Sequence, residues 1–302
     1  MNIGTTPYIW QNGTFVRWEN AKTHVLSHAL HYGSSVFEGI RVYPTGKGPA
    51  LRLVKDHVAR LFYSASTMRM KIPFTQSQIF KAIVETVRKN KLNEKGYVRP
   101  LAYYGYGKMG VNPVGAEVNL IIACWPWPTY LADTPIAVKI SKFIRIHPKS
   151  CFVDAKVCGY YVNNIFAIQD VVGPGCDEAL LLDFKGNIAE GPGENFFIVK
   201  KGIIYTPPLG TILKGITRRT VIDLARKLGY RVVEKDIKPR DAYAADEAFF
   251  TGTAAEVTAI GSIDGHSINK KKTGPIVGHL KKEYLDLVTG KSQKLKNILT
   301  YV

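Results

Sequence analysis

The sequence lacks any apolar run long enough to cross a membrane as a helix. Such a span needs about 18 or more consecutive apolar residues, and polar or charged residues interrupt every apolar stretch before that length. The chain also does not open with a charged segment followed by an apolar one, the pattern of a secretory leader. These absences argue against a helical membrane protein and against a secreted one, and we expect a cytoplasmic location.

Cysteine is scarce as well. The four cysteines, Cys124, Cys151, Cys158 and Cys176, form no CxxC pair and follow no zinc-binding spacing. We therefore expect no metal site, and we expect free buried thiols rather than disulfides.

Acidic residues are few relative to basic ones. The chain has 24 Asp and Glu against 41 Lys and Arg, which gives a formal net charge of +17. Such an excess can indicate a nucleic-acid partner. However, the lysines stand in short runs, such as residues 270–272 and 281–282, and no stretch interleaves them with aromatic residues. A basic nucleic-acid-binding protein is therefore the less favoured hypothesis, and the same charge suits small anionic substrates.

The remaining composition is that of a folded protein with room for two domains. The chain has 302 residues, of which 46% are hydrophobic and 22% charged. Two prolines among aromatic residues at 125–130 (WPWPTY) suit an extended connection. We place a small N-terminal domain at residues 1–126, an interdomain loop at residues 127–135 and a larger C-terminal domain at residues 136–302.

Hydrophobic periodicity and turn residues predict the elements of the first domain. An Asn-Gly pair between two apolar runs predicts a hairpin over residues 8–17. Apolar residues at helical spacing predict helices over residues 55–68 and 76–90. Strands are expected over residues 35–43, 51–54, 97–105 and 118–125, with a turn at 44–49 and a glycine-rich loop at 105–115.

The second domain alternates strands with helices. Gly229 follows a helical pattern directly, where a glycine commonly ends a helix. We expect strands over residues 136–141, 179–182, 195–200, 202–205, 232–237 and 247–251, and helices over residues 159–172, 217–228 and 275–289.

One lysine, Lys156, has unusual neighbours. Apolar residues flank it on both sides, and Tyr161 follows within reach of its side chain. A lysine shielded from water loses proton affinity and becomes a usable amine nucleophile. A tight turn that carries two acidic residues, residues 190–195 (EGPGEN), comes later in the chain. Pyridoxal phosphate requires such a lysine, a carboxylate and an anion site.

These segments and two later ones resemble a known family. Together with the Lys156 segment and the turn at 190–195, residues 213–218 (LKGITR) and 251–256 (TGTAAE) resemble the class IV, or fold type IV, pyridoxal-phosphate aminotransferases. The resemblance implies an α/β chain of the α+β type. It implies a small N-terminal α/β sandwich, a larger C-terminal α/β barrel-like domain and the cofactor between them.

Two segments near the N-terminus narrow the resemblance. Residues 27–33 (SHALHYG) and 36–41 (VFEGIR) resemble the branched-chain amino acid aminotransferases in particular. The matching segments occur in family order from about residue 8 to about residue 289.

The resemblance implies a set of residues that hold pyridoxal phosphate. Lys156 would form a Schiff base with it, and Tyr161 would donate to its phenolic oxygen. Glu190 would face the pyridine nitrogen, with Glu194 as the competing choice, to which we assign supporting hydrogen bonds. The full set is Arg60, Lys156, Tyr161, Glu190, Ile216, Thr217 and Thr253.

The residues alone allow plainer interpretations of the same positions. Arg60 can be a surface arginine whose stem covers the core. Thr217 can stand near an ordinary helix start, Glu190 in an exposed turn, and Tyr161 in the core.

The resemblance also implies a substrate pocket. Tyr97 and Arg99 would receive the acid, above all the second carboxylate of glutamate, and backbone donors of Thr253 and Ala254 would bind the α-carboxylate. The loop that contains Val111 would reach the pocket of a partner subunit. The full set is Tyr32, Phe37, Gly39, Tyr97, Arg99, Val111, Trp127, Tyr130, Thr253 and Ala254.

The sequence departs from the family pattern beside the lysine. Tyr160 stands where an asparagine is common, and Val157 and Cys158 replace the usual small or polar pair. These differences concern the shape of the site and the preferred substrate rather than the Schiff base.

The function that the resemblance implies is transamination by a ping-pong mechanism. Leucine, isoleucine or valine would give its amino group to 2-oxoglutarate, and the reverse. A homodimer or a higher homo-oligomer, such as a hexamer, would be the active unit. D-amino-acid transaminases and aminodeoxychorismate lyases share the fold and remain alternatives.

Overall fold

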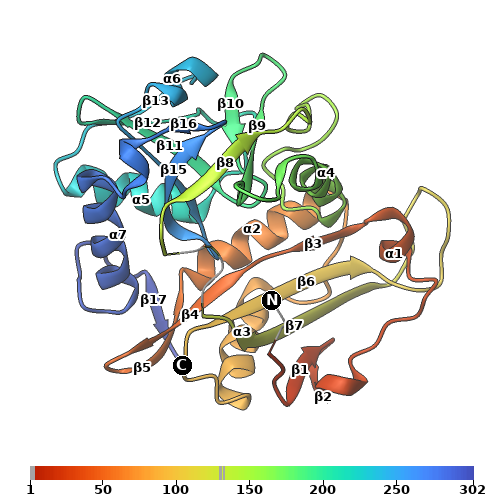
Figure 1. The fold of residues 1–302 in the computed structure, drawn as a ribbon. Helices are drawn as coiled ribbons and strands as arrows, with labels where there is room; N and C mark the ends of the chain where they lie inside the picture. Colours follow the sequence, from red (N-terminus) through yellow and green to blue (C-terminus); the bar gives the residue numbers. More distant parts are fainter. Residues whose placement is uncertain (1–3, 129–130, 132) are drawn as a thin grey trace.

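The computed structural model describes residues 4–128, 131 and 133–302. Its strands form two sheets, with the sheet built mainly from the N-terminal part of the chain below the other in Figure 1. Helices α2 (Val54–Thr67) and α3 (Gln76–Lys89) cover the first sheet. Helices α5 (Ile216–Lys227) and α7 (Pro275–Val288) pack against the second.

The first sheet is antiparallel and runs in the order β17-β5-β4-β6-β7-β1-β2, with β3 paired to β6. Its core combines the inner face of these strands with the apolar faces of α2 and α3. Its strands are β1 (Tyr8–Gln11), β2 (Thr14–Arg17), β3 (Ser35–Phe37), β4 (Ile40–Thr45), β5 (Gly48–Arg52), β6 (Gly96–Tyr104), β7 (Val118–Pro126) and β17 (Leu299–Tyr301).

Most predicted elements of this half are confirmed. The hairpin around Asn12 and Gly13 pairs Tyr8 with Arg17, and both helices begin within a residue of their predicted starts. The predicted turn at 44–49 is wrong in extent, because β4 continues to Thr45 and β5 already begins at Gly48. Local composition, rich in Gly and Pro, hid this strand pairing.

The single strand predicted over residues 35–43 is instead two strands. The break falls at Glu38 and Gly39, between β3 and β4. Gly39 lies so close to Tyr97 that a Cβ there would stand 1.7 Å from the tyrosine hydroxyl. The buried side chain of Glu38 turns away to bind Arg60. The break therefore serves close packing at the cavity described below.

The second sheet runs in the order β10-β9-β8-β15-β14-β11-β12-β13 and closes on itself, because β10 also pairs with β11. This ring is the barrel-like architecture predicted for the second half. Its strands are β8 (Ile136–Ile140), β9 (Glu178–Leu182), β10 (Ile188–Glu190), β11 (Asn195–Lys200), β12 (Ile203–Thr206), β13 (Val232–Glu234), β14 (Glu247–Gly252), β15 (Glu256–Ile263) and β16 (His266–Ser267), the last paired with β15.

Alternation along neighbouring strands fills both faces of this ring. Phe196 and Phe250 point into one core cluster, which lies among the strands. Phe197 and Phe249, one residue along, stack at 4.8 Å and point to the cluster under α5 and α7. Successive side chains of a strand face opposite sides, so the paired phenylalanines of β11 and β14 bury both surfaces.

The shorter helices and the chain end complete the fold. Helix α4 (Tyr161–Val171) follows a 3-10 turn (Cys158–Tyr160), so the helix predicted from residue 159 starts slightly later. Helices α1 (His28–Tyr32) and α6 (Pro239–Tyr243) each have five residues. Strand β17 brings the end of the chain back to β5 in the first sheet. Nothing in the described part of the chain forms a helix that could cross a membrane.

Candidate active site

Lys156 lies where the two halves of the structure meet. Its backbone N–H donates to Ser64 Oγ on α2 at 2.9 Å, and its carbonyl accepts from the N–H of Phe37 at 3.1 Å. Val157 forms an isolated antiparallel bridge with Val36. The loop before α4 is thus fastened to α2 and β3, which fixes the direction of the lysine side chain.

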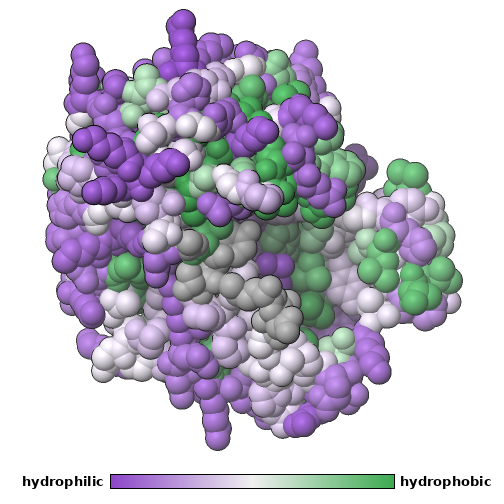
Figure 2. Space-filling model, viewed as in Figure 1, coloured by the Kyte–Doolittle hydropathy of each residue, from purple (hydrophilic) through white to green (hydrophobic). Residues whose placement is uncertain are grey.

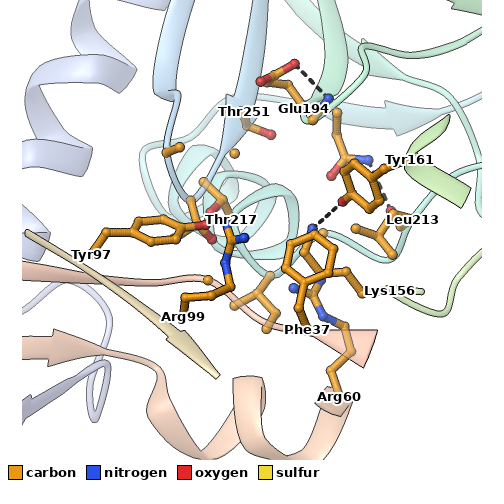
Figure 3. A pocket seen from close by; sticks show the side chains of 18 of the residues that line it. Phe37, Arg60, Tyr97, Arg99, Lys156, Tyr161, Glu194, Leu213, Thr217 and Thr251 are labelled. Carbon is orange, nitrogen blue, oxygen red and sulfur yellow. Dashed lines mark hydrogen bonds between the residues drawn. The ribbon is translucent and has the colours of Figure 1, made fainter. Parts of the chain in front are cut away.

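The Lys156 amine is desolvated and closely paired. Its Nζ donates to Tyr161 Oη at 2.6 Å and stands 4.7 Å from the centre of the Phe37 ring (Figure 3). Burial, reinforced by the positive charge of Arg60, lowers the pKa of Lys156 to about 8. Burial also raises the pKa of the Tyr161 hydroxyl, which keeps it protonated. A lysine of this kind is available as a neutral amine near neutral pH.

A cavity of about 470 Å³ opens in front of this amine. Side chains from both sheets line it, and Figure 3 shows how several of them converge. The predicted residues that line it are Phe37, Gly39, Arg60, Tyr97, Arg99, Trp127, Lys156, Tyr161, Ile216, Thr217, Thr253 and Ala254. Residues far apart in the sequence therefore meet at one place, as predicted.

The start of α5 forms an anion cradle in one wall of the cavity. Gly215 is its N-cap, and no described residue accepts a hydrogen bond from the N–H groups of Ile216 and Thr217. A helix start carries partial positive charge and free donors. A Cβ at Gly215 would stand 1.8 Å from Asn195 Oδ1. The glycine therefore allows α5 to begin close against Asn195, and the free donors remain at the cavity.

Arg60 adds a guanidinium to the same wall, and a buried carboxylate holds it. Its Nε and Nη2 donate to the two oxygens of Glu38 at 2.6 and 2.9 Å, and its Nη1 donates to the Lys214 carbonyl at 3.0 Å. His57 Nδ1 lies 2.7 Å from Glu38 Oε2. Burial alone would raise the pKa of Glu38, but the charge of Arg60 and the bonds from both partners hold it well below its usual range.

Sequence reasoning selected Arg60 and did not assign a role to Glu38. The signal was present, because Glu38 lies within the VFEGIR segment, but its partners lie 19 and 22 residues further along the chain. Only the packing of α2 against the β3–β4 break brings them together.

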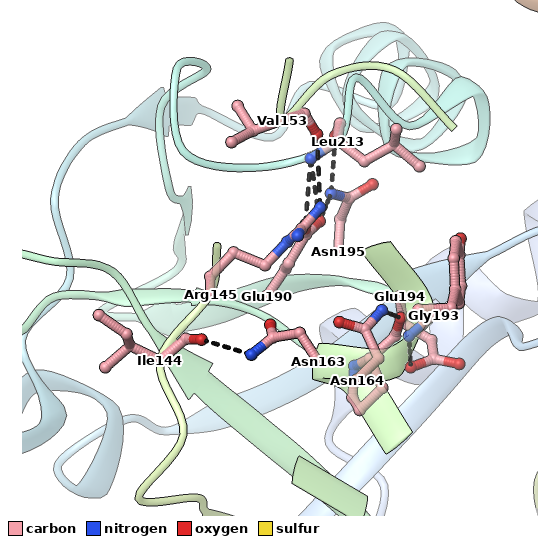
Figure 4. Close-up of polar contacts among 12 residues, drawn as sticks. Ile144, Arg145, Val153, Asn163, Asn164, Glu190, Gly193, Glu194, Asn195 and Leu213 are labelled. Carbon is pink, nitrogen blue, oxygen red and sulfur yellow. Dashed lines mark hydrogen bonds and ion pairs between the residues drawn. The ribbon is translucent and has the colours of Figure 1, made fainter. Parts of the chain in front are cut away.

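Glu190 lies behind the lysine in a second small cavity, which also borders Lys156 and Tyr161. Arg145 Nε donates to Glu190 Oε1 at 2.7 Å, Asn195 Nδ2 donates to Oε2 at 2.9 Å, and the Leu213 N–H contacts both oxygens (Figure 4). Burial raises the pKa of Glu190, and Arg145 opposes that rise. Arg145 is a residue that sequence reasoning missed, since nothing in its local pattern marks it.

Glu194, the competing carboxylate, lies on the wall of the main cavity. Its Oε2 accepts from the Gly193 N–H at 3.1 Å, the kind of supporting bond predicted for it. Burial, together with the charge of Glu178, raises its pKa to about 8. The turn at 190–195 therefore places two buried carboxyl groups at this end of the site, and of the two Glu190 has the arginine partner.

The opposite end of the cavity combines aromatic rings with one cation. The Arg99 guanidinium lies 4.6 Å from the centre of the Phe37 ring and 5.4 Å from that of Tyr97. Trp127 packs edge-on against Tyr97 at 4.8 Å. Buried Arg99 Nε and Thr251 Oγ1 have no hydrogen-bond partner among the described residues. An apolar wall with unused polar groups suits a ligand that has both an apolar chain and acidic groups.

Three predicted substrate residues are not part of this cavity. Tyr32 on α1 is 43% exposed, and Val111, in the loop between β6 and β7, is 85% exposed. Both lie on the arm that projects to the right in Figure 2, where apolar residues gather. Tyr130 lies outside the described residues.

The residues that depart from the family pattern have packing roles. Val157 is buried, and Tyr160 packs against the core of the first sheet. Cys158 lines the cavity, and burial raises the pKa of its thiol. The four cysteines are free. Among the described residues no group of three His, Cys, Asp or Glu is arranged to hold a metal ion.

The fold and the site together define an enzyme that uses a lysine amine beside an anion cradle. Comparison with known proteins agrees. The family profile described as amino-transferase class IV matches residues 35–263. A branched-chain-amino-acid aminotransferase of Pseudomonas aeruginosa is 46% identical over 289 residues, which cover 94% of each chain.

Two solved structures of a T.th. branched-chain amino acid aminotransferase superpose with TM-scores of 0.95 and cover 99% of both chains. One, 45% identical, is complexed with N-(5'-phosphopyridoxyl)-L-glutamate, and the other, 44% identical, with 4-methylvaleric acid. The chain belongs to the class IV aminotransferase family.

Enzymes of this family depend on pyridoxal phosphate, which confirms the predicted cofactor. The residues present fit it. The free N–H groups of Ile216 and Thr217, with Arg60 beside them, can take a phosphate, and Lys156 can take an aldehyde. Glu190 can accept a hydrogen bond from a pyridine nitrogen, although which of these residues contact the cofactor stays a prediction.

Proposed function

We propose that this chain is a branched-chain amino acid transaminase. It would move the amino group of leucine, isoleucine or valine to 2-oxoglutarate, and the reverse, by a ping-pong mechanism. The observation that carries the proposal is the desolvated Lys156 amine, 2.6 Å from Tyr161, in a cavity that joins an anion cradle to an apolar wall. The names of the relatives described above support the choice of substrates.

The roles of the residues near the lysine follow from their contacts. When bound, pyridoxal phosphate supplies a ring that accepts electrons from the substrate. Lys156, once free, takes the proton from the substrate Cα and returns one as a general acid. Tyr161 holds the amine in place, and Glu190, ionised through Arg145, keeps a pyridine nitrogen protonated.

The substrate end must accept two kinds of side chain in turn. Phe37, Tyr97 and Trp127 offer apolar surface to a branched aliphatic chain, and Gly39 leaves room beside Tyr97. Arg99, whose Nε has no described partner, can pair with the second carboxylate of glutamate. Thr253 and Ala254 can offer backbone donors to the α-carboxylate that both substrates share.

The active unit would be a homodimer, with higher assembly such as a hexamer built from it. Support comes from the exposed apolar arm, which includes Val25, Leu30, Tyr32, Met109 and Val111. In a dimer this arm would reach the partner's pocket and bring Tyr32 and Val111 to the substrate. We also propose a cytoplasmic location and domains at residues 1–126 and 136–302, joined by residues 127–135.

A substrate panel tests the function. Purified protein with pyridoxal phosphate would be assayed with the three L-amino acids, D-alanine and aminodeoxychorismate. We expect turnover of leucine, isoleucine and valine with 2-oxoglutarate, and parallel lines in double-reciprocal plots. Preference for D-alanine, or conversion of aminodeoxychorismate, would move the chain to another branch of the fold.

A further inference from the structure

Arg41 is a buried arginine that binds backbone carbonyls instead of a carboxylate. It lies on β4, is 1% exposed, and forms no ion pair with any described residue. Its Nε donates to the Thr253 carbonyl at 3.3 Å and its Nη2 to the Ala254 carbonyl at 2.9 Å, while Nη1 donates to the carbonyl of Trp127. A buried guanidinium is costly unless its donors are used, so these bonds fix the peptides that accept them.

The arginine joins the two sheets at the substrate end of the cavity. Strand β4 belongs to the first sheet, whereas Thr253 and Ala254 form the turn between β14 and β15 of the second. Thr253, Ala254 and Trp127 all line the cavity. Arg41 itself lies behind these residues and is not part of the cavity lining.

A second residue of β4 holds the far end of the same turn. Tyr43 lies two positions after Arg41 and therefore on the same face of the strand. Its hydroxyl donates to Glu256 Oε1 at 2.7 Å, and Lys95 Nζ donates to Oε2 at 2.9 Å. Glu256 has a φ of +56°, a left-handed conformation that a residue with a side chain adopts at a cost. The contacts from β4 and Lys95 help to maintain it.

The direction of the carbonyls determines the direction of the donors. In a trans peptide the C=O and the N–H point to opposite sides. Because Arg41 binds the carbonyls of Thr253 and Ala254, the N–H groups of Ala254 and Ala255 turn away from it. No described residue accepts a hydrogen bond from the N–H of Thr253, Ala254 or Ala255.

We propose that Arg41, supported by Tyr43, is a positioning residue that presents these backbone N–H groups to the α-carboxylate of the substrate. The inference rests on the proposed function and explains how one sheet sets the geometry of a binding turn that belongs to the other. The substrate itself would not touch Arg41.

The test compares two inhibitors of one shape. 4-Methylvaleric acid carries the carboxylate, and 4-methylvaleramide is its neutral counterpart. For Arg41→Lys we expect inhibition by the acid, against leucine turnover, to weaken about tenfold while inhibition by the amide changes little, the size expected for loss of an aligned bond to a charged group. KM for leucine should rise more than kcat falls. Loss of general packing would weaken both inhibitors alike.

Two further variants make the outcome decisive. Tyr43→Phe removes a single hydroxyl and should shift the acid-to-amide ratio in the same direction, so it decides the matter if Arg41→Lys fails to fold. Arg218→Lys is the matched control, because Arg218 is buried and also donates to a backbone carbonyl, that of Pro207, at 2.8 Å. Its ratio should equal that of the unmodified protein.

The results separate the two levels of the proposal. An unmodified protein that binds the acid, together with variants whose ratio is unchanged, would overturn the inference alone. An unmodified protein that neither turns over leucine nor prefers the acid would overturn the proposed function, and the inference with it.

Discussion

The lowered pKa of Lys156 gives a measurable pH dependence. With a pKa of about 8, about one amine in ten is neutral at pH 7, against about one in three thousand for an unperturbed lysine. After removal of the cofactor, the rate at which pyridoxal phosphate attaches should rise about tenfold per pH unit and level off above pH 8 or so. Stopped-flow absorbance over this range would measure it.

The control for this profile is Lys156→Ala, which reports background reaction at other lysines. A rate that keeps rising toward the pKa of an ordinary lysine would mean that burial and the charge of Arg60 do not act on the amine as the structure indicates.

Removing the lysine amine should abolish catalysis and leave the fold intact. No other described lysine lines the cavity, so none can take the proton from the substrate. Lys156→Ala should reduce kcat for leucine by several orders of magnitude while the far-ultraviolet circular dichroism is preserved. Lys139→Ala, on β8 and away from the cavity, is the control and should keep its activity. Substantial turnover by Lys156→Ala would refute the role of the residue.

Individual residues show how far the sequence could predict the site. Lys156, Arg60 and Thr217 stand in recognisable segments, and the structure gathers them as predicted. Arg145 and Arg41 were not predicted, because they act on partners 45 and more than 200 residues away and their own surroundings carry no signal. A buried arginine that binds a carbonyl or a carboxylate is visible only after the chain is folded.

At the scale of elements, the start of α5 should be intolerant of a side chain. A Cβ at Gly215 would stand 1.8 Å from Asn195 Oδ1, so Gly215→Ala must displace either the helix start or the amide that supports Glu190. The dissociation constant of pyridoxal phosphate, measured by fluorescence titration, should rise about tenfold or more, roughly 1.4 kcal/mol.

Gly46→Ala is the matched control for this substitution. Gly46 lies in the turn between β4 and β5, and no heavy atom outside its immediate neighbours comes within 4 Å of a Cβ there. Equal cofactor affinity in Gly215→Ala and the unmodified protein would show that the phosphate does not depend on this close approach.

Helix α3 offers a stability test that is separate from the site. Thr75 forms a capping box with Gln78: its hydroxyl accepts from the Gln78 N–H at 3.2 Å, and its own N–H donates to Gln78 Oε1 at 2.8 Å. Thr75→Ala should lower the free energy of unfolding by about 1 kcal/mol in urea denaturation. Gln76→Ala, at an exposed neighbouring position, should change it much less. Similar values for the two would argue against the cap.

The elements that sequence reasoning found are those with strong local patterns. Helices α2 and α3 have long apolar faces, and the first hairpin has an Asn-Gly turn. Strand β15 was not predicted, because part of it follows directly on a segment assigned to the site. Strand β17 has three residues and pairs with β5, about 250 residues earlier. Closure of the second sheet through β10 and β11 also depends on distant pairing rather than on local pattern.

At the scale of the whole molecule, the exposed apolar arm makes a prediction about assembly. Val111, 85% exposed, should be covered in the dimer, so Val111→Asp should bury a charge at the interface at a large cost. Sedimentation velocity should show more monomer for this variant, together with reduced turnover of leucine. Leu209→Asp alters an exposed apolar residue elsewhere and should leave assembly unchanged. A protein that is monomeric and active without the substitution would contradict the proposed dimer.

The central claim is that Lys156 and pyridoxal phosphate act together on an amino acid. The most direct measurement is the visible absorption spectrum of the purified protein before and after addition of leucine. We predict a visible band, due to cofactor attached to Lys156, that gives way to absorption at shorter wavelength once the amino group is transferred, and that returns with 2-oxoglutarate. A protein that stays colourless after incubation with pyridoxal phosphate, or a band that leucine does not change, would contradict the account.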